Sequence, residues 1–499
     1  MKMVKSLLLG SAASVAAIVG AQAADLPVKA KPVEYVRVCS TYGAGFFYIP
    51  GTESCIRIGG YMRNQWTIGS GQSTAFQTIG GNPYGQRQRD YFVNETRGAF
   101  SFDVRNTTQY GVMRAYFQEY ITTTNTTAVT PALQTAYIQL AGFTAGRFLG
   151  TYYTAWDTDI GSFTTSSFTG RDTSQSAGVE YRAQFGNGIS AAIGAFDPRR
   201  SGIYDRQDTQ LVIGAFATSG GTIGAANSAY HLPDIQGDVR VEQAWGGFHF
   251  GALLHENNVI YNGTNNAAPF GTTGLEQSGF PETKYGYSFI ASIQLKQLPT
   301  GAGDSLVISA QYGKGALTQI QGSAPKTAFA LFGPGNDSGF YNSVAFGWFF
   351  DSVFDSSGTL DGGKQHLTEG WSINAGFTHY WIPSVLRTSL YGNMQSVHYD
   401  ETAKQIICTT VAGASRFGFT AGSVCDPDFK QYVIGSRTAW NITPDLEISG
   451  DILYRQYDTA SSGTILANTT MVAGKPQGVG YEIKDQGQFM FISRFIRSW

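Results

Sequence analysis

The chain has 499 residues, a formal net charge of −2, and only 14% charged residues beside 62 glycines and 14% aromatic residues. Soluble globular proteins carry about 25% charged residues, so the composition is unusual for that class, and the lack of a basic patch argues against a nucleic-acid partner. After the N-terminal region no run of about 18 consecutive apolar residues occurs, which excludes a transmembrane helix. A membrane-embedded β-barrel fits this composition.

Residues 1–23 have the pattern of a secretory signal peptide. Lys2 and Lys5 precede the short apolar run Leu7–Val19, and Ala21–Ala23 forms a small-residue cleavage site of the A-x-A type. A retained helical anchor is the alternative, but the apolar run is too short for a membrane helix. We therefore expect the mature chain to be exported.

Four cysteines form two local pairs along the sequence. Cys39 and Cys55 lie 16 residues apart, and Cys408 and Cys425 lie 17 residues apart. An oxidising compartment favours the disulfides Cys39–Cys55 and Cys408–Cys425, although four cysteines permit three connectivities. Zinc ligation is the alternative, but the chain contains no C-x-x-C motif.

The first strong strand pattern is Cys55–Ile68. Its even positions are apolar except for Asn64, whereas its odd positions carry Arg57, Arg63 and other polar groups. Because successive side chains of a strand point to opposite faces, this segment has one apolar and one polar face. A tilted strand of about ten residues can cross a bilayer only within a closed barrel, where every backbone group is paired.

The same pattern recurs along the chain, with long polar loops alternating with short turns such as Asn187-Gly188. We expect 16 strands, at Cys55–Ile68, Phe92–Arg105, Tyr110–Ile121, Leu133–Ala141, Thr144–Phe148, Gly178–Phe185, Ile189–Phe196, Gln236–Trp245, Phe248–Glu256, Lys284–Lys296, Leu306–Gly313, Trp371–Trp381, Arg387–Tyr399, Tyr432–Asn441, Leu446–Tyr457 and Gln488–Trp499. An even number places both termini on the periplasmic side. Ser343–Phe354 is also apolar enough for a strand, and with a partner it would raise the number to 18.

The fold class indicated by this pattern is all-β, a transmembrane antiparallel β-barrel. The expected parts of the chain are a signal peptide (1–23), a periplasmic leader (24–54) and the barrel with its long extracellular loops (55–499).

Several blocks of the sequence resemble the alphaproteobacterial porin family. They are ADLPVKA, EYVRVCSTYGAGFFYIPGTESCIRIGGYMR, RGAFSFDVR, AYIQLAGFTAGR, PDIQGDVRVEQAWG, TPDLEISGDILY and the terminal ISRFIRSW, and they cover the chain from Asp25 to Trp499. The resemblance implies an integral outer-membrane diffusion pore for small hydrophilic solutes and ions, a homotrimer, contact with lipid and lipopolysaccharide, and no cofactor or metal. Trp499 departs from the commoner terminal Phe of the family.

The resemblance also places a constriction loop after the fifth strand, at Leu149–Ala177, folded into the lumen. This segment carries Asp157, Asp159 and Asp172, with Arg171 as its only base. The polar strand faces supply the basic residues expected on the pore wall, namely Arg57, Arg63, Arg97, Arg114, Arg147 and Arg182. Acids on the loop facing bases on the wall would select among ions and polar solutes.

Structural alternatives stand beside this interpretation. The strand arginines could pair with Glu95, Asp103 or Glu180 and stiffen the wall, and the aspartates Asp157 and Asp159 could cap local turns. The Tyr and Phe residues of the strands fit packing toward lipid or a neighbouring subunit better than sugar-binding rungs.

Enzyme motifs such as H-E-x-x-H, G-x-S-x-G and G-x-x-x-x-G-K-[ST] are absent from the sequence. His249 and His255 share one face of a predicted strand, and we interpret them as a structural or solvated pair rather than a hydrolytic site. A barrel enzyme with an activated nucleophile and a secreted β-rich adhesin or soluble sandwich are the competing hypotheses. Membrane fractionation separates the sandwich from the barrel, and bilayer conductance separates a pore from an enzyme.

Overall fold

One large antiparallel sheet dominates the fold. A computed structural model describes residues 37–69, 92–124, 129–154, 156, 175–198, 202–206, 230–259, 282–321, 328–333, 343–358, 360–409, 418–466 and 478–499. The chain divides into two compact units, Met1–Arg57 and Ile58–Trp499.

Sixteen strands form the wall of the barrel. They are β2 (Cys55–Gly69), β3 (Phe92–Thr108), β4 (Gly111–Thr124), β5 (Thr130–Leu140), β6 (Phe143–Leu149), β7 (Gln175–Gly186), β8 (Ile189–Phe196), β10 (Asp234–Gln243), β11 (Gly246–Asn257), β12 (Lys284–Lys296), β13 (Ser305–Lys314), β18 (Glu369–Ile382), β19 (Leu386–His398), β20 (Phe429–Thr443), β21 (Leu446–Thr459) and β24 (Gln486–Ser498). Consecutive wall strands pair antiparallel, and β24 closes on β2 from Tyr61–Ser498 to Gly69–Met490. The closed barrel confirms the predicted fold class and excludes the sandwich alternative.

All 16 predicted strands coincide with wall strands. The ambiguous segment Ser343–Phe354 does not join the wall, because it forms β15 (Ser343–Trp348) and β16 (Ser352–Phe354) in two smaller sheets. The alternative of 18 wall strands is therefore wrong. Every residue from Ser343 to Phe354 for which burial is described is buried, which explains why the segment shows no two-residue alternation.

The two faces of each wall strand differ in the way the sequence predicts. In β2 the side chains of Arg63, Gln65 and Thr67 are buried, whereas Met62 and Trp66 are exposed. An apolar exterior and a polar interior suit a strand between hydrocarbon and a lumen. We call the face that carries Arg63 and Gln65, and the residues in register with it on the other wall strands, the lumenal face.

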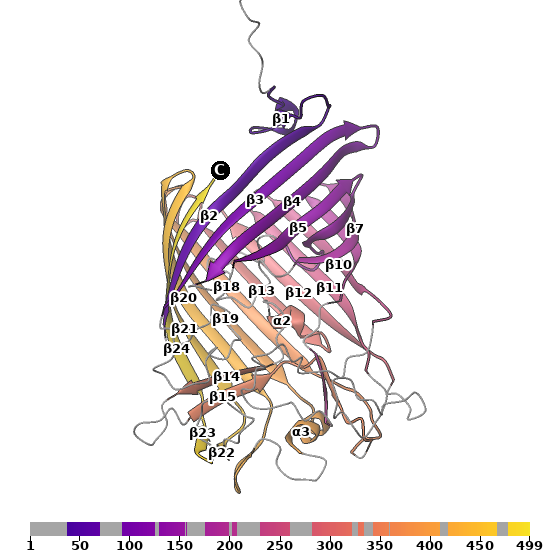
Figure 1. Ribbon diagram of the computed structural model, residues 1–499, viewed down its shortest axis with the longest axis vertical. Helices are drawn as coiled ribbons and strands as arrows, with labels where there is room; N and C mark the ends of the chain where they lie inside the picture. Colours follow the sequence, from indigo (N-terminus) through magenta and orange to yellow (C-terminus); the bar gives the residue numbers. More distant parts are fainter. Residues whose placement is uncertain are drawn as a thin grey trace, which may run out of the picture. The chain divides into compact units, whose positions relative to one another are not determined.

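Short turns and long connections lie at opposite ends of the barrel. The turn between β7 and β8 is Asn187-Gly188, with φ angles of 50° and 73°. Positive φ at both central residues matches the twist of a two-residue hairpin. In Figure 1 the elements β14, β15, β22, β23 and α3, which belong to long connections, lie at the end away from the C-terminus, which is the extracellular end in bacterial barrels.

The long connections form small sheets and helices of their own. One sheet contains β14 (Ala328–Gly333), β15, β22 (Gly463–Leu466) and β23 (Gly480–Ile483), and another contains β9 (Ile203–Asp205), β16 and β17 (His366–Leu367). The helices are α2 (Thr318–Gln321) and α3 (Glu401–Cys408). Within the described ranges, no helix has both the length and the apolar character needed to span a membrane.

The N-terminal unit is held by a disulfide. It contains the 3-10 helix η1 (Ser40–Tyr42) and β1 (Phe47–Tyr48), which pairs with the start of β2 at Phe47–Ile56 and Tyr48–Cys55. Cys39 and Cys55 are bonded, with their Cα atoms 6.1 Å apart, and both are buried beside Phe46. The predicted first disulfide is confirmed.

Candidate functional site: the barrel lumen

Charged side chains gather on the lumenal face in clusters of two arginines around one carboxylate. In the first cluster, Arg63 on β2 and Arg97 on β3 both reach Glu95, and the Arg97 Nη2 to Glu95 Oε1 distance is 3.6 Å. The guanidinium of Arg97 also lies 4.0 Å from the centre of the Tyr120 ring. Arg63 and Arg97 therefore do pair with a neighbouring carboxylate, as the structural alternative proposed. With two arginines and one glutamate, the cluster still keeps one net positive charge.

The second cluster joins β3 to β4. It contains Arg105, which was not among the pore-wall arginines predicted from the sequence. Asp103 accepts bonds from Arg105 at 2.9 and 2.7 Å and from Arg114 at 3.0 Å through both of its oxygens. Asp103 is 2% exposed, whereas each arginine is about a quarter exposed, at 25%. The carboxylate is thus covered and the positive groups face the lumen. Arg105 follows Asp103 by two residues, so strand periodicity alone could have placed it there.

A third cluster lies on the C-terminal strands. Glu447 on β21 binds Arg387 of β19 at 2.5 Å and Arg437 of β20 at 2.6 Å. Next to it, Arg494 on β24 donates two hydrogen bonds to Gln65 of β2. The closure of β24 on β2 therefore joins arginines from both ends of the sequence into one basic stretch, from β19 to β4. The order of the strands along the chain does not predict this basic stretch, because the contact between Arg494 and Gln65 depends on where the sheet closes.

A fourth group of charges, on β7, β10 and β11, is more evenly balanced. Arg182 reaches Asp238 at 3.0 Å and Glu180 at 3.8 Å, and Arg240 also binds Asp238. His249 Nε2 lies 3.6 Å from the same Asp238 carboxylate. Two arginines share two carboxylates here, so the group adds little net charge to this side of the lumen.

The two histidines of β11 share one face, as their spacing predicted, and both are buried on the lumenal side. His255 Nδ1 lies 2.7 Å from Asp234 Oδ1, and both side chains are 1% exposed. Among the described residues, no group of three or more His, Cys, Asp or Glu side chains could hold a metal ion.

Arg147 is placed differently from the expectation. The register of β6 pairs Arg147 with Ala136 on β5 and with Ala177 on β7. Ile138, two residues along β5 from Ala136 and on the same face, is 59% exposed on the outer side of the barrel. The prediction that Arg147 lines the lumen is therefore wrong. Thr144 is lumenal, and a period of two from Thr144 leaves Arg147 on the outer face.

Arg57 belongs to the N-terminal unit, where its guanidinium lies 5.3 Å from the centre of the Phe46 ring. Its side chain is exposed. The lumenal positions of the remaining four predicted arginines, Arg63, Arg97, Arg114 and Arg182, agree with the strand registers.

The first residues of the predicted loop Leu149–Ala177 run along lumenal side chains. The Tyr152 hydroxyl lies 2.5 Å from Ser288 Oγ on β12, and the Tyr152 amide donates to Gln236 of β10. Arg240 donates to the carbonyl oxygens of Thr151 and Tyr153, at 3.3 and 3.0 Å. The three acids Asp157, Asp159 and Asp172, and Arg171 with them, lie outside the described residues.

A second segment, between β13 and β18, also packs against the lumenal face. We call its described residues, 315–321, 328–333, 343–358 and 360–368, the insert. Its buried side chains, among them Leu317, Phe346 and Phe349, form one apolar cluster with lumenal residues of β19, β20, β21 and β24. The Phe349 ring lies 4.8 Å from that of Phe429 on β20. Apolar burial of this extent fixes the insert against the lumenal face of these strands.

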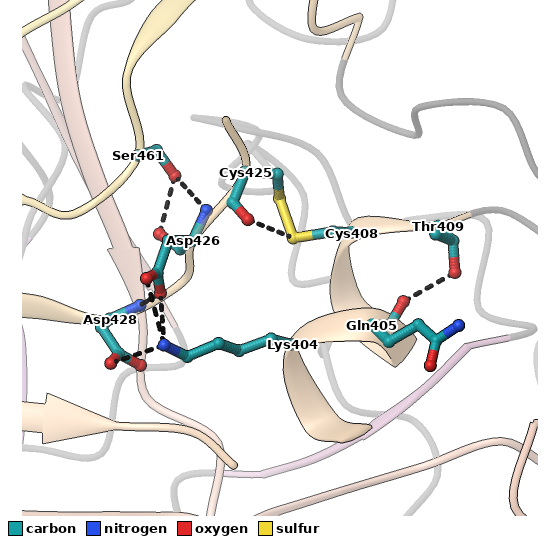
Figure 2. The surroundings of a disulfide bond; sticks show 8 residues. All are labelled: Lys404, Gln405, Cys408, Thr409, Cys425, Asp426, Asp428 and Ser461. Atoms are coloured by element: carbon teal, nitrogen blue, oxygen red, sulfur yellow. Dashed lines mark hydrogen bonds and ion pairs between the residues drawn. A yellow bond between two sulfur atoms is a disulfide. The ribbon is translucent and has the colours of Figure 1, made fainter. Parts of the chain in front are cut away.

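The connection between β19 and β20 contains a disulfide-bonded helix, α3 (Figure 2). Cys408 and Cys425 are bonded, with Cα atoms 5.9 Å apart, which confirms the second predicted disulfide. Lys404 of α3 binds Asp426 and Asp428, each at 3.0 Å. Burial lowers the pKa of Lys404, but its hydrogen bonds to Asp428 and Asp426 outweigh that effect, so the pKa stands above the usual value.

His366 links the insert to the start of α3. Its Nδ1 lies 2.9 Å from Asp400, and its Nε2 lies 2.6 Å from Asp361. Asp400 also caps α3 by accepting from the Ala403 amide at 2.8 Å. The hydrogen bond to Asp400 is the largest influence on the pKa of His366 and raises it; burial opposes this rise, and Asp361 adds to it.

A closed antiparallel barrel with an apolar exterior and a charged lumen defines the chain as a β-barrel of the kind that spans bacterial outer membranes. The profile of a family described as "Porin subfamily" matches residues 25–488. The chain belongs to this porin family and is an integral protein of the outer membrane. The resemblance found in the sequence is confirmed.

Curated relatives and a solved structure agree with this assignment. Over 166 residues the chain is 39% identical to "Putative outer membrane protein y4fJ" of Sinorhizobium fredii, which covers 32% of this chain and 46% of that protein. Over 261 residues it is 31% identical to "Porin Omp2b" of Brucella abortus (strain 2308), which covers 49% of this chain and 63% of that protein. The matches thus span less than two thirds of these relatives.

One solved structure similar to this chain is the outer membrane channel DcaP of Acinetobacter baumannii. It matches with a TM-score of 0.55 at 11% identity, over 91% of this chain and 99% of that one. At this identity the likeness is one of fold alone.

Proposed function

We propose that the protein forms a water-filled channel in the outer membrane of a Gram-negative bacterium, through which small hydrophilic solutes and ions diffuse passively. The observation that carries the proposal is the closed 16-stranded wall with arginine and carboxylate side chains on its lumenal face. Barrels of this size are wide enough for an aqueous passage, and charged side chains face hydrocarbon only at a high cost.

Conductance across a planar bilayer tests this function. The purified, folded full chain should produce stepwise increases in current in salt solution. If folded protein inserts into the bilayer but adds no current, the proposed function is wrong. A catalytic role is not part of the proposal, because the family to which the chain belongs is described as a porin subfamily.

We propose in addition that Leu149–Ala177 forms the constriction, with Asp157, Asp159 and Asp172 facing the wall arginines. The support is the course of its first residues along Gln236, Arg240 and Ser288. Deleting Asp157–Thr169 should widen the pore and raise its conductance. A correctly assembled deletion variant with unchanged conductance and selectivity would show that this segment is not the constriction.

We propose that the assembly is a homotrimer that packs through the outer faces of β2, β3 and β4. Asn64 and Asn94 exchange hydrogen bonds at 3.2 Å on that outer face, and Asn64 also donates to Thr96 at 2.9 Å. Glu119 lies on the same side, opposite Phe100. Polar groups are costly in hydrocarbon, so a neighbouring subunit is the better environment for them. The rest of the exterior would contact lipid and lipopolysaccharide.

The trimer can be tested by the mass of the detergent-solubilised complex. Replacing Asn64 by Asp should shift that mass toward the monomer if the face is buried between subunits. An unchanged trimer would place the interface on other strands.

A further inference from the structure

The lumenal faces of the wall strands differ sharply in exposure. On β4 the lumenal side chains from Arg114 through Tyr116, Gln118 and Tyr120 to Thr122 are all half-buried. On β5 the lumenal Thr135, Tyr137 and Gln139 are half-buried too, and Thr130 is exposed. Water can therefore reach this part of the wall along nearly its whole length.

The opposite part of the wall is covered. Gln311 on β13, Ser372 on β18, Gln395 on β19 and Gln431 on β20 oppose one another in one row of the sheet. They are 3%, 0%, 0% and 0% exposed. Among the described residues, none of these amide and hydroxyl groups has a hydrogen-bond partner. Their burial marks a sector of the wall that bulk solvent does not reach.

The insert is what covers that row. Its Leu317, Ile320 and Phe346 belong to the apolar cluster that includes Tyr391 of β19 and Leu453 of β21. Ser343, at the start of β15, also accepts a hydrogen bond from Gln486 of β24 at 2.9 Å. The contacts with β19, β21 and β24 extend the cover across the C-terminal strands.

The insert and the start of the loop after β6 meet inside the barrel. The Tyr153 hydroxyl donates to the backbone oxygen of Gln319 in α2 at 3.0 Å. Tyr152, Tyr153 and Ala316 share an apolar cluster with Leu253 of β11 and Ile290 of β12. The covered sector therefore extends from β10 to β24, and the two segments hold each other in place.

We propose that the conducting path is an off-centre passage along the lumenal faces of β3, β4 and β5, and that the insert is a second element that narrows the pore. This inference rests on the proposed channel function. The wall of the passage alternates guanidinium groups with phenol rings: Arg114 lies 5.1 Å from the Tyr116 ring centre and 5.4 Å from that of Tyr137. Solutes would pass along a basic, aromatic surface.

Single cysteines placed on the two sides of the lumen test the proposal. The four native cysteines are all in disulfides, so an introduced thiol is the only one that can react. Gln118→Cys places it in the passage, and Gln395→Cys places it under the insert; both replace a lumenal glutamine. The probe is a cationic methanethiosulfonate, added during a planar-bilayer recording of the full-length protein.

We expect partial loss of current in Q118C and no loss in Q395C. Reaction of both variants after unfolding in denaturant shows that each thiol is intact, and Thr122→Cys substitutes for Q118C if that variant does not assemble. Modification of Q395C at a rate comparable with Q118C would overturn the proposal, because water would then reach the wall behind the insert. A conducting channel whose Q118C and T122C variants both stay unmodified would overturn it as well. Absence of any current from the unaltered protein would instead refute the channel function itself.

Discussion

The second arginine cluster offers a charge series at one place in the lumen. Replacing Asp103 by Asn raises the charge of the cluster by one unit. Replacing Arg105 and Arg114 together by Gln lowers it by two units. Since both arginines are about a quarter exposed, at 25%, and face the lumen, a passing ion should sense these changes directly.

The size of the effect follows from Coulomb's law. In bulk water, an ion about 8 Å from a unit charge gains or loses about 0.5 kcal/mol. Anions and cations respond with opposite sign, so the difference between them is about 1 kcal/mol per unit of cluster charge. Screening at about 0.1 M salt, with a Debye length of about 10 Å, halves this value, which corresponds to about a twofold change in the permeability ratio.

The assay is the reversal potential of the channel across a salt gradient. At about 0.1 M salt we expect D103N to raise the anion-to-cation permeability ratio about twofold and R105Q/R114Q to lower it about fourfold. Both shifts should nearly vanish at about 1 M salt, where the Debye length is about 3 Å. Arg497→Gln is the control, because Arg497 is 67% exposed beside Asp445, in the turn before β21.

The reasoning fails if D103N and R105Q/R114Q move the reversal potential in the same direction. It also fails if neither variant moves the reversal potential while the conductance remains. In the first case the substitutions would have altered the packing of the wall, and in the second the ions would pass elsewhere.

Three further outcomes are expected. Neutralising Asp157 and Asp159 to Asn should move the reversal potential toward anion preference, and an unchanged potential would place these acids away from the pore. Replacing Cys408 and Cys425 by Ser removes a loop closure worth about 3 kcal/mol, so protease should cut the α3 connection faster in the variant, while equal rates would mean that other contacts hold it. The raised pKa of His366 stabilises its link to α3 fully below the unfolded pKa of about 6.5, and this stabilisation is lost as pH rises through the folded value. Hydrogen exchange of α3, corrected for the intrinsic rate, should therefore quicken at alkaline pH, and His366→Gln should abolish the change; a variant that keeps the change contradicts this role.

The wall of the barrel could be predicted from the sequence because its cause is local. Alternation of apolar and polar residues, together with turns such as Asn187-Gly188, is set within each strand and hairpin. The same rule, applied strictly, would also have placed Arg147 correctly. That residue was assigned to the lumen by its charge, although the period counted from Thr144 puts it on the outside.

The basic stretch across the seam could not be predicted in this way. Arg494 and Gln65 are neighbours only because β24 closes on β2, and the register of that closure is a property of the whole sheet. Arg387 and Arg437 share Glu447 for the same kind of reason, since three strands must pair in one particular register. Strand periodicity gives the face on which a side chain lies, but not its partner.

The sequence does contain a feature that indicates the insert, namely apolar residues at lumenal positions of the wall strands. The prediction of alternating strands did not take it into account. In a barrel filled with water, lumenal positions should be polar on every strand. On β20, β21 and β24 the lumenal face instead carries Val433, Leu453 and Ile492, all of which are buried in the apolar cluster of the insert. Apolar residues on both faces of a wall strand require an apolar partner inside the barrel. The apolar, non-alternating run Ser343–Phe354 supplies that partner. The apolar lumenal residues of β20, β21 and β24 and the insert that packs on them together explain why the lumen is open on one side only.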